Sequence, residues 1–524
     1  MSLDLAREVI KVSNIINREI TQIIVENDII VPDTKPDVVK ILIAEAEAYT
    51  TSAVVNTDEK STFIKGIIRY KILYKPDDPD IDIKSININA EFSHEMDTPV
   101  AGKDVRNIVK CLAEHVECEI INGRKINTKT ILQLNSKVMA EEEYVLINDI
   151  SDNGDIQVLR NNMEINNFIG SSEALYTIKE SMEVPEGNPP IREILSNDVK
   201  IINKDFRLSD NKVIVTGEMN IVTLYAGDDQ ESSIRLMEHA TPFTQFVDLS
   251  GINDESDCEI GYEVRDYSFE AAEDADGELR VMNMEVEVSI NVYGSVRKNI
   301  DIVHDAYGLR SGVTLDKKVV KTEEKVTENI SQAVLKDTAT IGEGNPEIVE
   351  IINMVSKPVL TDYKVQEDKI EIEGFVANNL IYLSNNSEQN MSCLQSDIPL
   401  KQTIDIKGVK PGMACEIELL TEHANYSMLS SKDVELRLVV GVVSKVYKNV
   451  EKHIIEKAIE IPFDESRKAD KKAGIIVYFI QPGDTLWEIA KKYTTTVNDI
   501  QRVNMFQDQD SIDDGMQILI TRKS

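Results

Sequence analysis

The residue types that most often carry out chemistry are present in this chain, but they are scattered. His94-Glu95 lacks the second histidine of a helical zinc-binding pair. The run from Asp149 to Asp155 resembles a calcium loop, but its twelfth position is Arg160, where such loops need a glutamate. No GxxxxGK[ST] phosphate loop occurs, and in the C-terminal fifty residues no base stands beside a nucleophile. We therefore expect no enzyme, no metal and no other cofactor.

Charge and composition narrow the class of partner. Acidic residues number 92 against 57 basic ones, for a formal net charge of −35. Such a chain repels nucleic acid and attracts basic partners, so we expect no nucleic-acid binding. No stretch approaches the roughly 18 apolar residues of a membrane-spanning helix. Five cysteines without a CxxC pair indicate reduced thiols in a cytosol, and Met1–Leu5 lacks the basic start of a signal peptide.

The only tryptophan, Trp487, lies near the C-terminus in the phrase QPGDTLWEIA of residues 481–490. Pro482-Gly483 ends a short apolar strand, and Asp484 is expected to cap the helix that follows. A second short helix is predicted over residues 497–503, and alternating apolar residues over 516–520 predict a closing strand. The face of the first helix is predicted by spacing at i, i+3, i+4 and i+7: Leu486, Ile489, Ala490 and Tyr493.

This segment, residues 476–520, resembles a LysM domain. The resemblance rests on QPGDTLWEIAKKY, on residues 497–504 and on the final G-x-x-I-x-I, with Asp514-Gly515 in place of the usual Pro-Gly turn. It implies two antiparallel strands packed against two helices, with a shallow groove for N-acetylglucosamine polymers. Asp484 is alternatively only a helix cap, and Trp487 is alternatively a residue of the domain core and not of the binding surface. The implied groove residues are Gly483, Asp484, Thr485 and Leu486, with Asn504 and Met505 opposite.

The chain before this segment repeats itself three times. Each copy has a proline five residues after an aliphatic residue, and apolar residues two, five and six positions after the proline. The prolines are 153 residues apart (189 minus 36) and 157 residues apart (346 minus 189), so each copy is about one domain in size. Further along each copy, a glycine precedes a tyrosine by eight residues: Gly66 and Tyr74, Gly217 and Tyr225, Gly374 and Tyr382.

The proline segments predict a turn into one or two helical turns, because proline suits the first helical position. Alternation with period two, as in residues 284–288, predicts strands, with hairpin turns at Asn122-Gly123 and Asp276-Gly277. The recurring glycines are expected at strand bulges or close contacts. The predicted fold class is mainly β: three tandem sandwich or barrel-like repeats, each with one short helix, followed by a small βααβ LysM domain.

The domain boundaries follow from these patterns. We expect an amphipathic helix or tail over residues 1–18 and a charged, flexible tether over 464–472 within a linker at 456–474. The expected repeats are 19–148, 173–302 and 324–455, the connectors are 149–172 and 303–323, and the LysM domain is 475–524.

The three repeats resemble the DUF3794 family of endospore-forming Firmicutes, and the whole layout is similar to the spore-coat morphogenetic proteins of clostridia. The most specific marks are the three P-x-[VI]-x-x-I-[LI] segments and QPGDTLW. The resemblance implies a non-enzymatic scaffold of the mother-cell cytoplasm that lies at the forespore surface, in the spore coat. The repeats would recruit other coat proteins or self-associate.

The same resemblance implies that the LysM domain binds the ATPase of the coat's basement layer, instead of a glycan or in addition to one. Protein interfaces concentrate their binding energy in buried aromatic and aliphatic anchors. The residues expected to contact a protein partner are therefore Ile475, Trp487, Met505 and Phe506. The alternative is a protein of the spore wall or cortex that binds peptidoglycan or another N-acetylglucosamine polymer.

Overall fold

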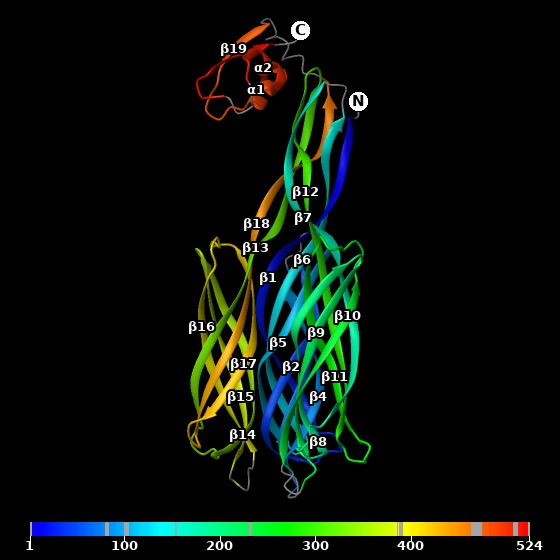
Figure 1. The fold of residues 1–524 in the computed structure, drawn as a ribbon, viewed down its shortest axis with the longest axis vertical. Helices are drawn as coiled ribbons and strands as arrows, with labels where there is room; N and C mark the ends of the chain where they lie inside the picture. The colour runs from blue at the N-terminus through cyan, green and yellow to red at the C-terminus, as the bar shows by residue number, and fades with distance from the viewer. Residues whose placement is uncertain are drawn as a thin grey trace.

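The structure, a computed structural model, describes residues 3–78, 83–98, 104–151, 155–229, 233–384, 386, 391–462, 474–506 and 512–521. These residues form three elongated β bodies side by side and a narrower stalk that rises from one end of them. The LysM domain lies at the far tip of the stalk (Figure 1).

Each repeat consists of two three-stranded antiparallel sheets, so the mainly β prediction is confirmed. The sheet orders are β1-β6-β5 with β2-β3-β4, β11-β12-β7 with β10-β9-β8, and β13-β18-β17 with β14-β15-β16. The first repeat comprises β1 (Asp4–Ile30), β2 (Val38–Asn56), β3 (Ser61–Pro76), β4 (Lys84–Asp97), β5 (Asp104–Asn122) and β6 (Lys125–Ser151). The second comprises β7 (Ile156–Glu183), β8 (Ile191–Ser209), β9 (Lys212–Gly227), β10 (Ile234–Asp248), β11 (Asp257–Ala272) and β12 (Val281–Gly308). The third comprises β13 (Gly312–Thr340), β14 (Ile348–Gln366), β15 (Lys369–Ser384), β16 (Met391–Asp405), β17 (Ala414–Met428) and β18 (Asp433–Ile461).

Both predicted hairpin turns are confirmed. Asn122-Gly123 leads from β5 into its antiparallel partner β6, and Asp276-Gly277 lies between the paired strands β11 and β12. Gly277 has a φ of +81°, in the left-handed region that a residue with a Cβ rarely adopts.

The short helix predicted after each proline is wrong, because these residues begin strands β2, β8 and β14. Each of these strands has two register shifts within its first six residues, at equivalent places: Val38/Lys40 and Ile41/Ile43, Ile191/Glu193 and Ile194/Ser196, and Ile348/Glu350 and Ile351/Asn353. A β-bulge inserts one residue and resets the period-two alternation. Apolar residues three and four positions apart therefore arise here without a helix.

The recurring glycines lie at close contacts, as predicted. Gly66, Gly217 and Gly374 each lie opposite a bulge in the preceding strand. Their partners on the other side are Phe92, Phe243 and Leu400. A Cβ on Gly66 would lie 2.6 Å from the Tyr49 carbonyl oxygen and would also collide with the Phe92 ring.

The recurring tyrosines tie each body to its own proline segment. All three are buried, and each donates a hydrogen bond from its hydroxyl to a proline carbonyl oxygen. The bonds are Tyr74 to Pro36 (3.0 Å), Tyr225 to Pro189 (3.2 Å) and Tyr382 to Pro346 (3.0 Å). The prolines and tyrosines that recur in the sequence therefore have a structural role.

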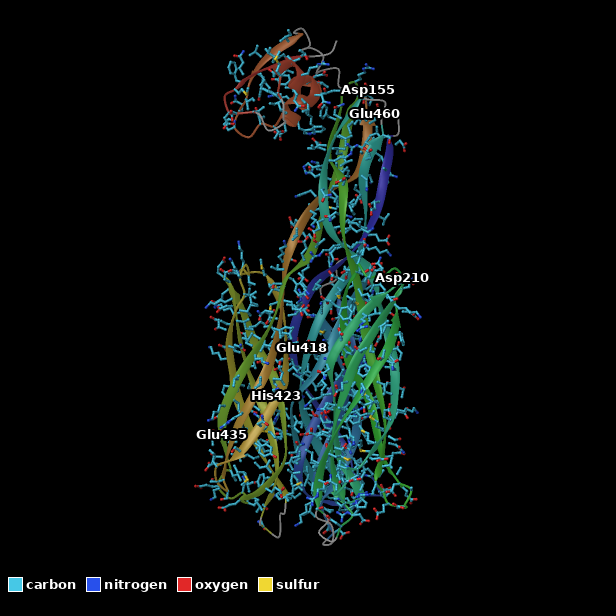
Figure 2. The ribbon with its side chains drawn as sticks, viewed as in Figure 1. Asp155, Asp210, Glu418, His423, Glu435 and Glu460 are labelled. Carbon is cyan, nitrogen blue, oxygen red and sulfur yellow. The ribbon has the colours of Figure 1, made fainter. Side chains whose placement is uncertain are left out.

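The stalk is built from the first and last strands of every repeat, which pair as long ribbons: β1 with β6, β7 with β12, and β13 with β18. The six strands share a buried core of Ile10, Val12, Tyr144, Leu146, Met163, Ile165, Ile300, Ile302, Val320 and Ile454. A second cluster lies closer to the tip, where Figure 2 labels Asp155 and Glu460.

The stalk corrects the roles that we assigned to the segments between the repeats. Residues 4–18 belong to β1, so the predicted N-terminal helix is wrong. Their apolar residues pack as a strand, in which Ile10 and Val12 point into the stalk core two positions apart. The predicted connectors lie largely in strands β6, β7, β12 and β13, and β18 continues to Ile461 within the predicted linker. The predicted tether, 464–472, lies outside the described residues.

The three bodies pack around a shared apolar cluster. Sheets β2-β3-β4, β8-β9-β10 and β14-β15-β16 each contribute to it, with Ile43, Leu73, Ile83, Leu195, Leu224, Ala226, Ile234, Ile381 and Met391. Charged contacts fasten the bodies further. Arg18 of the first repeat donates two 2.7 Å hydrogen bonds to Glu323 of the third, and Arg69 donates one of 2.6 Å to Asp266 of the second.

Candidate functional site

The LysM domain forms in the predicted order, with β19 (Ile475–Phe479), α1 (Leu486–Tyr493), α2 (Val497–Asn504) and β20 (Gln517–Thr521). β19 and β20 pair antiparallel. Leu486, Ile489 and Ala490 are buried on one face of α1, as their spacing predicted. Both helices begin at a threonine cap: Thr485 accepts from the Glu488 amide (3.1 Å) and Thr496 from the Asp499 amide (2.9 Å).

Asp484 does not cap α1, contrary to our prediction. Its carboxylate turns back over the Pro482-Gly483 turn and accepts hydrogen bonds from the Gln481 amide (2.8 Å) and the Tyr478 hydroxyl (2.7 Å). These bonds lower the pKa of Asp484, and the bond to its carboxylate raises the pKa of Tyr478 to about 12. Asp484 therefore stabilises the loop that precedes the helix.

Asn504 is also engaged inside the domain. Its side-chain amide donates to the carbonyl oxygens of Ile500 (2.8 Å) and Leu519 (2.7 Å), and its amide oxygen accepts from the Leu519 backbone (2.7 Å). These bonds tie the end of α2 to β20. The two polar side chains with the clearest capacity to bind a sugar, Asp484 and Asn504, thus both make hydrogen bonds that hold the fold together.

The apolar candidates are placed in three different ways. Leu486 is buried, and Phe506 is half-buried against the core of the LysM domain. Trp487 packs on the same core, and its indole Nε1 donates a 2.8 Å hydrogen bond to Asp305 at the end of β12 in the stalk. Met505, by contrast, is 89 % exposed.

The outer face of the β19-β20 sheet is the exposed apolar surface of the LysM domain. Ile475, Val477 and Phe479 alternate along β19 and are all exposed, and Leu519 pairs with Val477 on β20. We call these four residues the sheet face. The opposite side of the sheet packs on the domain core through Ile518 and Ile520.

Of the four sheet-face residues, Ile475 alone was predicted from the sequence to contact a partner. The missed signal is that β19 is apolar on both of its sides. The two helices cover one side of this two-stranded sheet, and no described helix or strand of the domain packs on the other side.

Gly483 and Thr485 are exposed in the loop between β19 and α1. Gly483 has a φ of +87°, which the turn requires and which glycine adopts without strain. Of the predicted groove residues, Gly483, Thr485 and Met505 are thus exposed, Leu486 is buried, and Asp484 and Asn504 are hydrogen-bonded within the domain.

A second candidate site is a cavity of about 450 Å³ that the three bodies enclose between them. Two ion pairs involve its charged lining residues: Glu47 Oε1 lies 2.5 Å from Lys71 Nζ, and Lys200 Nζ lies 3.0 Å from Asp198 Oδ2. Glu47, Lys200 and Lys357 occupy equivalent positions, 153 and 157 residues apart as the prolines are. The charge at this position therefore differs between the repeats: it is acidic in the first and basic in the second and third, and all three side chains line the cavity.

The residue types that bind metals are dispersed. Within the described ranges, no group of three or more histidine, cysteine, aspartate or glutamate side chains could hold a metal ion. His94 lies on β4, His304 on β12 and His423 on β17, where Figure 2 labels it. None of the described helices is long and apolar enough to cross a membrane.

Comparison with known families finds two domain types. The SipL SPOCS domain matches residues 37–121, 190–272 and 347–429, and the LysM domain matches residues 478–521. The SPOCS matches cover strands β2–β5, β8–β11 and β14–β17, so most of the ribbons that form the stalk lie outside them. Comparison with curated proteins and with solved structures finds no match.

Both domain types are non-catalytic binding domains, and the LysM domain is of the peptidoglycan-binding type. The chain is therefore a SipL-like sporulation protein, built from three SPOCS repeats followed by a LysM domain.

Proposed function

We propose that this protein is a scaffold of the spore coat whose LysM domain binds the ATPase of the coat's basement layer. The proposal places the protein on the mother-cell side of the forespore surface. The observation that carries it is the sheet face, where Ile475, Val477, Phe479 and Leu519 are exposed together. A patch of this kind on a small domain is typical of a protein-binding surface.

The polar side chains of the expected glycan groove support the same choice. A glycan site needs donors and acceptors aimed at the sugar, whereas Asp484 and Asn504 make their hydrogen bonds within the domain. A protein partner requires only that apolar anchors be accessible, as Ile475 and Met505 are.

The test is titration of the full chain against the coat ATPase. Ile475→Asp places a charge on the exposed side of β19 in the proposed interface and should weaken binding by tenfold or more, which is about 1.4 kcal/mol or more. The matched control is Val54→Asp, which changes an equally exposed aliphatic residue on β2 of the first repeat. Equal affinity of wild type and Ile475→Asp would reject the sheet face as the binding surface.

Glycan binding is the second candidate function, and it is favoured by the LysM match and by the exposed Gly483 and Thr485. Chitin oligomers titrated into the full chain test it. Saturable binding that Ile475→Asp leaves intact, together with no binding of the ATPase, would replace the scaffold with a wall-binding protein.

The repeats have a feature suited to recruiting coat proteins or a second copy of the chain. Ile20 on β1 and Ile330 on β13 occupy equivalent positions, 310 residues apart as Pro36 and Pro346 are, and Leu175 on β7 lies two residues after the equivalent position in the second repeat. All three are exposed, and their strands are edge strands of their sheets. An exposed aliphatic residue on the edge strand of each repeat offers three contact points. Changing all three to aspartate should abolish any self-association that sedimentation detects in the wild type.

A further inference from the structure

The LysM domain makes a compact polar and aromatic contact with the stalk, although the two parts lie about 180 residues apart in the sequence. Besides the Trp487 bond, Lys491 Nζ donates to both carboxylate oxygens of Asp305, at 2.7 Å each. Tyr307 donates from its hydroxyl to the Thr495 carbonyl oxygen at 2.7 Å. The rings of Tyr307 and Trp487 meet edge to face, with centroids 4.9 Å apart.

These groups are shielded from solvent as well as close together. The Asp305 side chain is only 14 % exposed, and two hydrogen-bond donors of α1 satisfy its charge. Tyr307 is buried within the apolar cluster of the LysM domain, and Leu309 packs against that cluster. Charge-assisted hydrogen bonds in a partly buried place are stronger than those on an open surface.

A bulge at the end of β12 directs this contact. The register between β7 and β12 shifts between Val303 and Asp305, and such a shift re-aims the side chains that follow it. The other two ribbons shift at the equivalent place, which makes Asp149 and Lys457 the counterparts of Asp305.

The counterparts of Tyr307 in the other ribbons are Ser151 and Ile459, counted from the same bulges. A serine hydroxyl is too short to reach across a domain boundary as the tyrosine does, and isoleucine has no hydroxyl. Asp149 is already paired with Arg160 of the neighbouring strand. The tip of the stalk therefore offers three similar positions, and the ribbon of β7 and β12 alone combines a carboxylate with an aromatic hydroxyl.

We propose that the end of β12 is a seat for the LysM domain, in which Asp305 and Tyr307 hold Trp487 and Lys491. Trp487 is then a docking residue within the chain, and the seated domain turns the sheet face outward. The seat itself stands on these contacts alone. Its consequence for partner binding rests on the proposed function, since it assigns the outer contact to the sheet face and not to Trp487.

The test uses Trp487 as its own reporter, because it is the only tryptophan in the chain. Acrylamide quenching and the emission maximum of the full chain are compared for wild type, Asp305→Ala and the matched control Asp149→Ala. Asp305→Ala should shift the emission to longer wavelength and increase quenching, whereas the control should match wild type. Unchanged quenching in Asp305→Ala would overturn the proposal.

Two further measurements keep the result clear. Lys491→Met removes the charged partner of Asp305, so it should also increase the quenching of Trp487. If it does not, the proposal is also overturned. The seat predicts that Asp305→Ala still binds the coat ATPase, since the sheet face is untouched. An Asp305→Ala chain that frees Trp487 while wild type binds no ATPase would uphold the seat and reject the proposed function.

Discussion

Replacing Arg18 with methionine should weaken the contact between the third repeat and the first. Arg18 lies on β1 and donates one hydrogen bond to each carboxylate oxygen of Glu323 on β13, both at 2.7 Å. It also donates a 3.1 Å bond to Glu416 on β17. Methionine keeps much of the side-chain length but leaves Glu323, which is 8 % exposed, with its charge unmatched by Arg18.

The expected loss is about 3 kcal/mol. Breaking a buried ion pair from one side costs about 3–5 kcal/mol, and the 20 % exposure of Arg18 places this pair at the lower end. The matched control is Arg297→Met in the stalk, where Arg297 is 65 % exposed and 3.7 Å from Glu164. An exposed pair of this kind contributes about 0–1 kcal/mol.

The assay is urea denaturation followed by far-UV circular dichroism, with the free energy taken from the shift in the midpoint of the first transition. The double variant Arg18→Met/Glu323→Gln adds a prediction of sign: it should be more stable than Arg18→Met, since the second change removes the unmatched charge. Equal midpoints for Arg18→Met and Arg297→Met would refute the reasoning, as would a double variant less stable than Arg18→Met.

Three further predictions concern single contacts. Tyr74→Phe, Tyr225→Phe and Tyr382→Phe each remove a hydroxyl that donates to a proline carbonyl oxygen, and each should lower the free energy of unfolding by about 1–2 kcal/mol. A lower melting temperature in only one of the three variants would contradict their shared role. Gly374→Ala should lower the melting temperature more than Gly217→Ala. The new Cβ at 374 would collide with the backbone carbonyl of Val359, whereas the Cβ at 217 would lie 2.7 Å from the ring of Phe243, which can move. The reverse order of melting temperatures would show that the bulge opposite Gly374 is not rigid. Burial alone would raise the pKa of Asp305, but hydrogen bonds from Lys491 and Trp487 lower it below the usual aspartate value of about 4. The charged carboxylate therefore stabilises the seat above that pH, and Trp487 quenching should rise only as the pH falls through the lowered pKa; a rise between pH 5 and 7 would contradict this.

The sequence predicted the small domain more accurately than the large ones. The spacing of Leu486, Ile489 and Ala490 predicts α1 correctly, because a short helix on one core keeps a single period. The β repeats do not keep one period. In β2 the register shifts after Val38 and again after Ile41, so apolar residues fall at helical spacing in a strand.

The stalk could not be predicted from the sequence because its strands are 27–29 residues long, and each strand contributes one part to the stalk and another part to the body of its repeat. A strand of typical length carries one alternating pattern, whereas β1 shifts register between Ile15 and Asn17 as it passes from stalk to body. Charged residues along these strands form cross-strand ion pairs, such as Lys321 with Glu451 at 3.3 Å.

The candidate site was predicted in part. The LysM phrase led to Trp487, but no local pattern could show that this residue faces Asp305, about 180 positions earlier. The prediction that Asp484 caps α1 is wrong because the next residue, Thr485, is the cap, and the Asp484 carboxylate accepts a hydrogen bond from Tyr478 instead. The exposure of Ile475, Val477 and Phe479 depends on which other parts of the chain pack on that side of β19, and the sequence of the strand alone does not show this.

The most direct test of the account is hydrogen–deuterium exchange of the full chain with and without the coat ATPase. If the sheet face is the interface, the ATPase slows exchange in β19 and β20, residues 475–479 and 517–521, and leaves residues 486–491 at the stalk contact unchanged. Slower exchange in residues 483–487 and 504–506, with β19 and β20 unaffected, would contradict it by placing the partner in the groove.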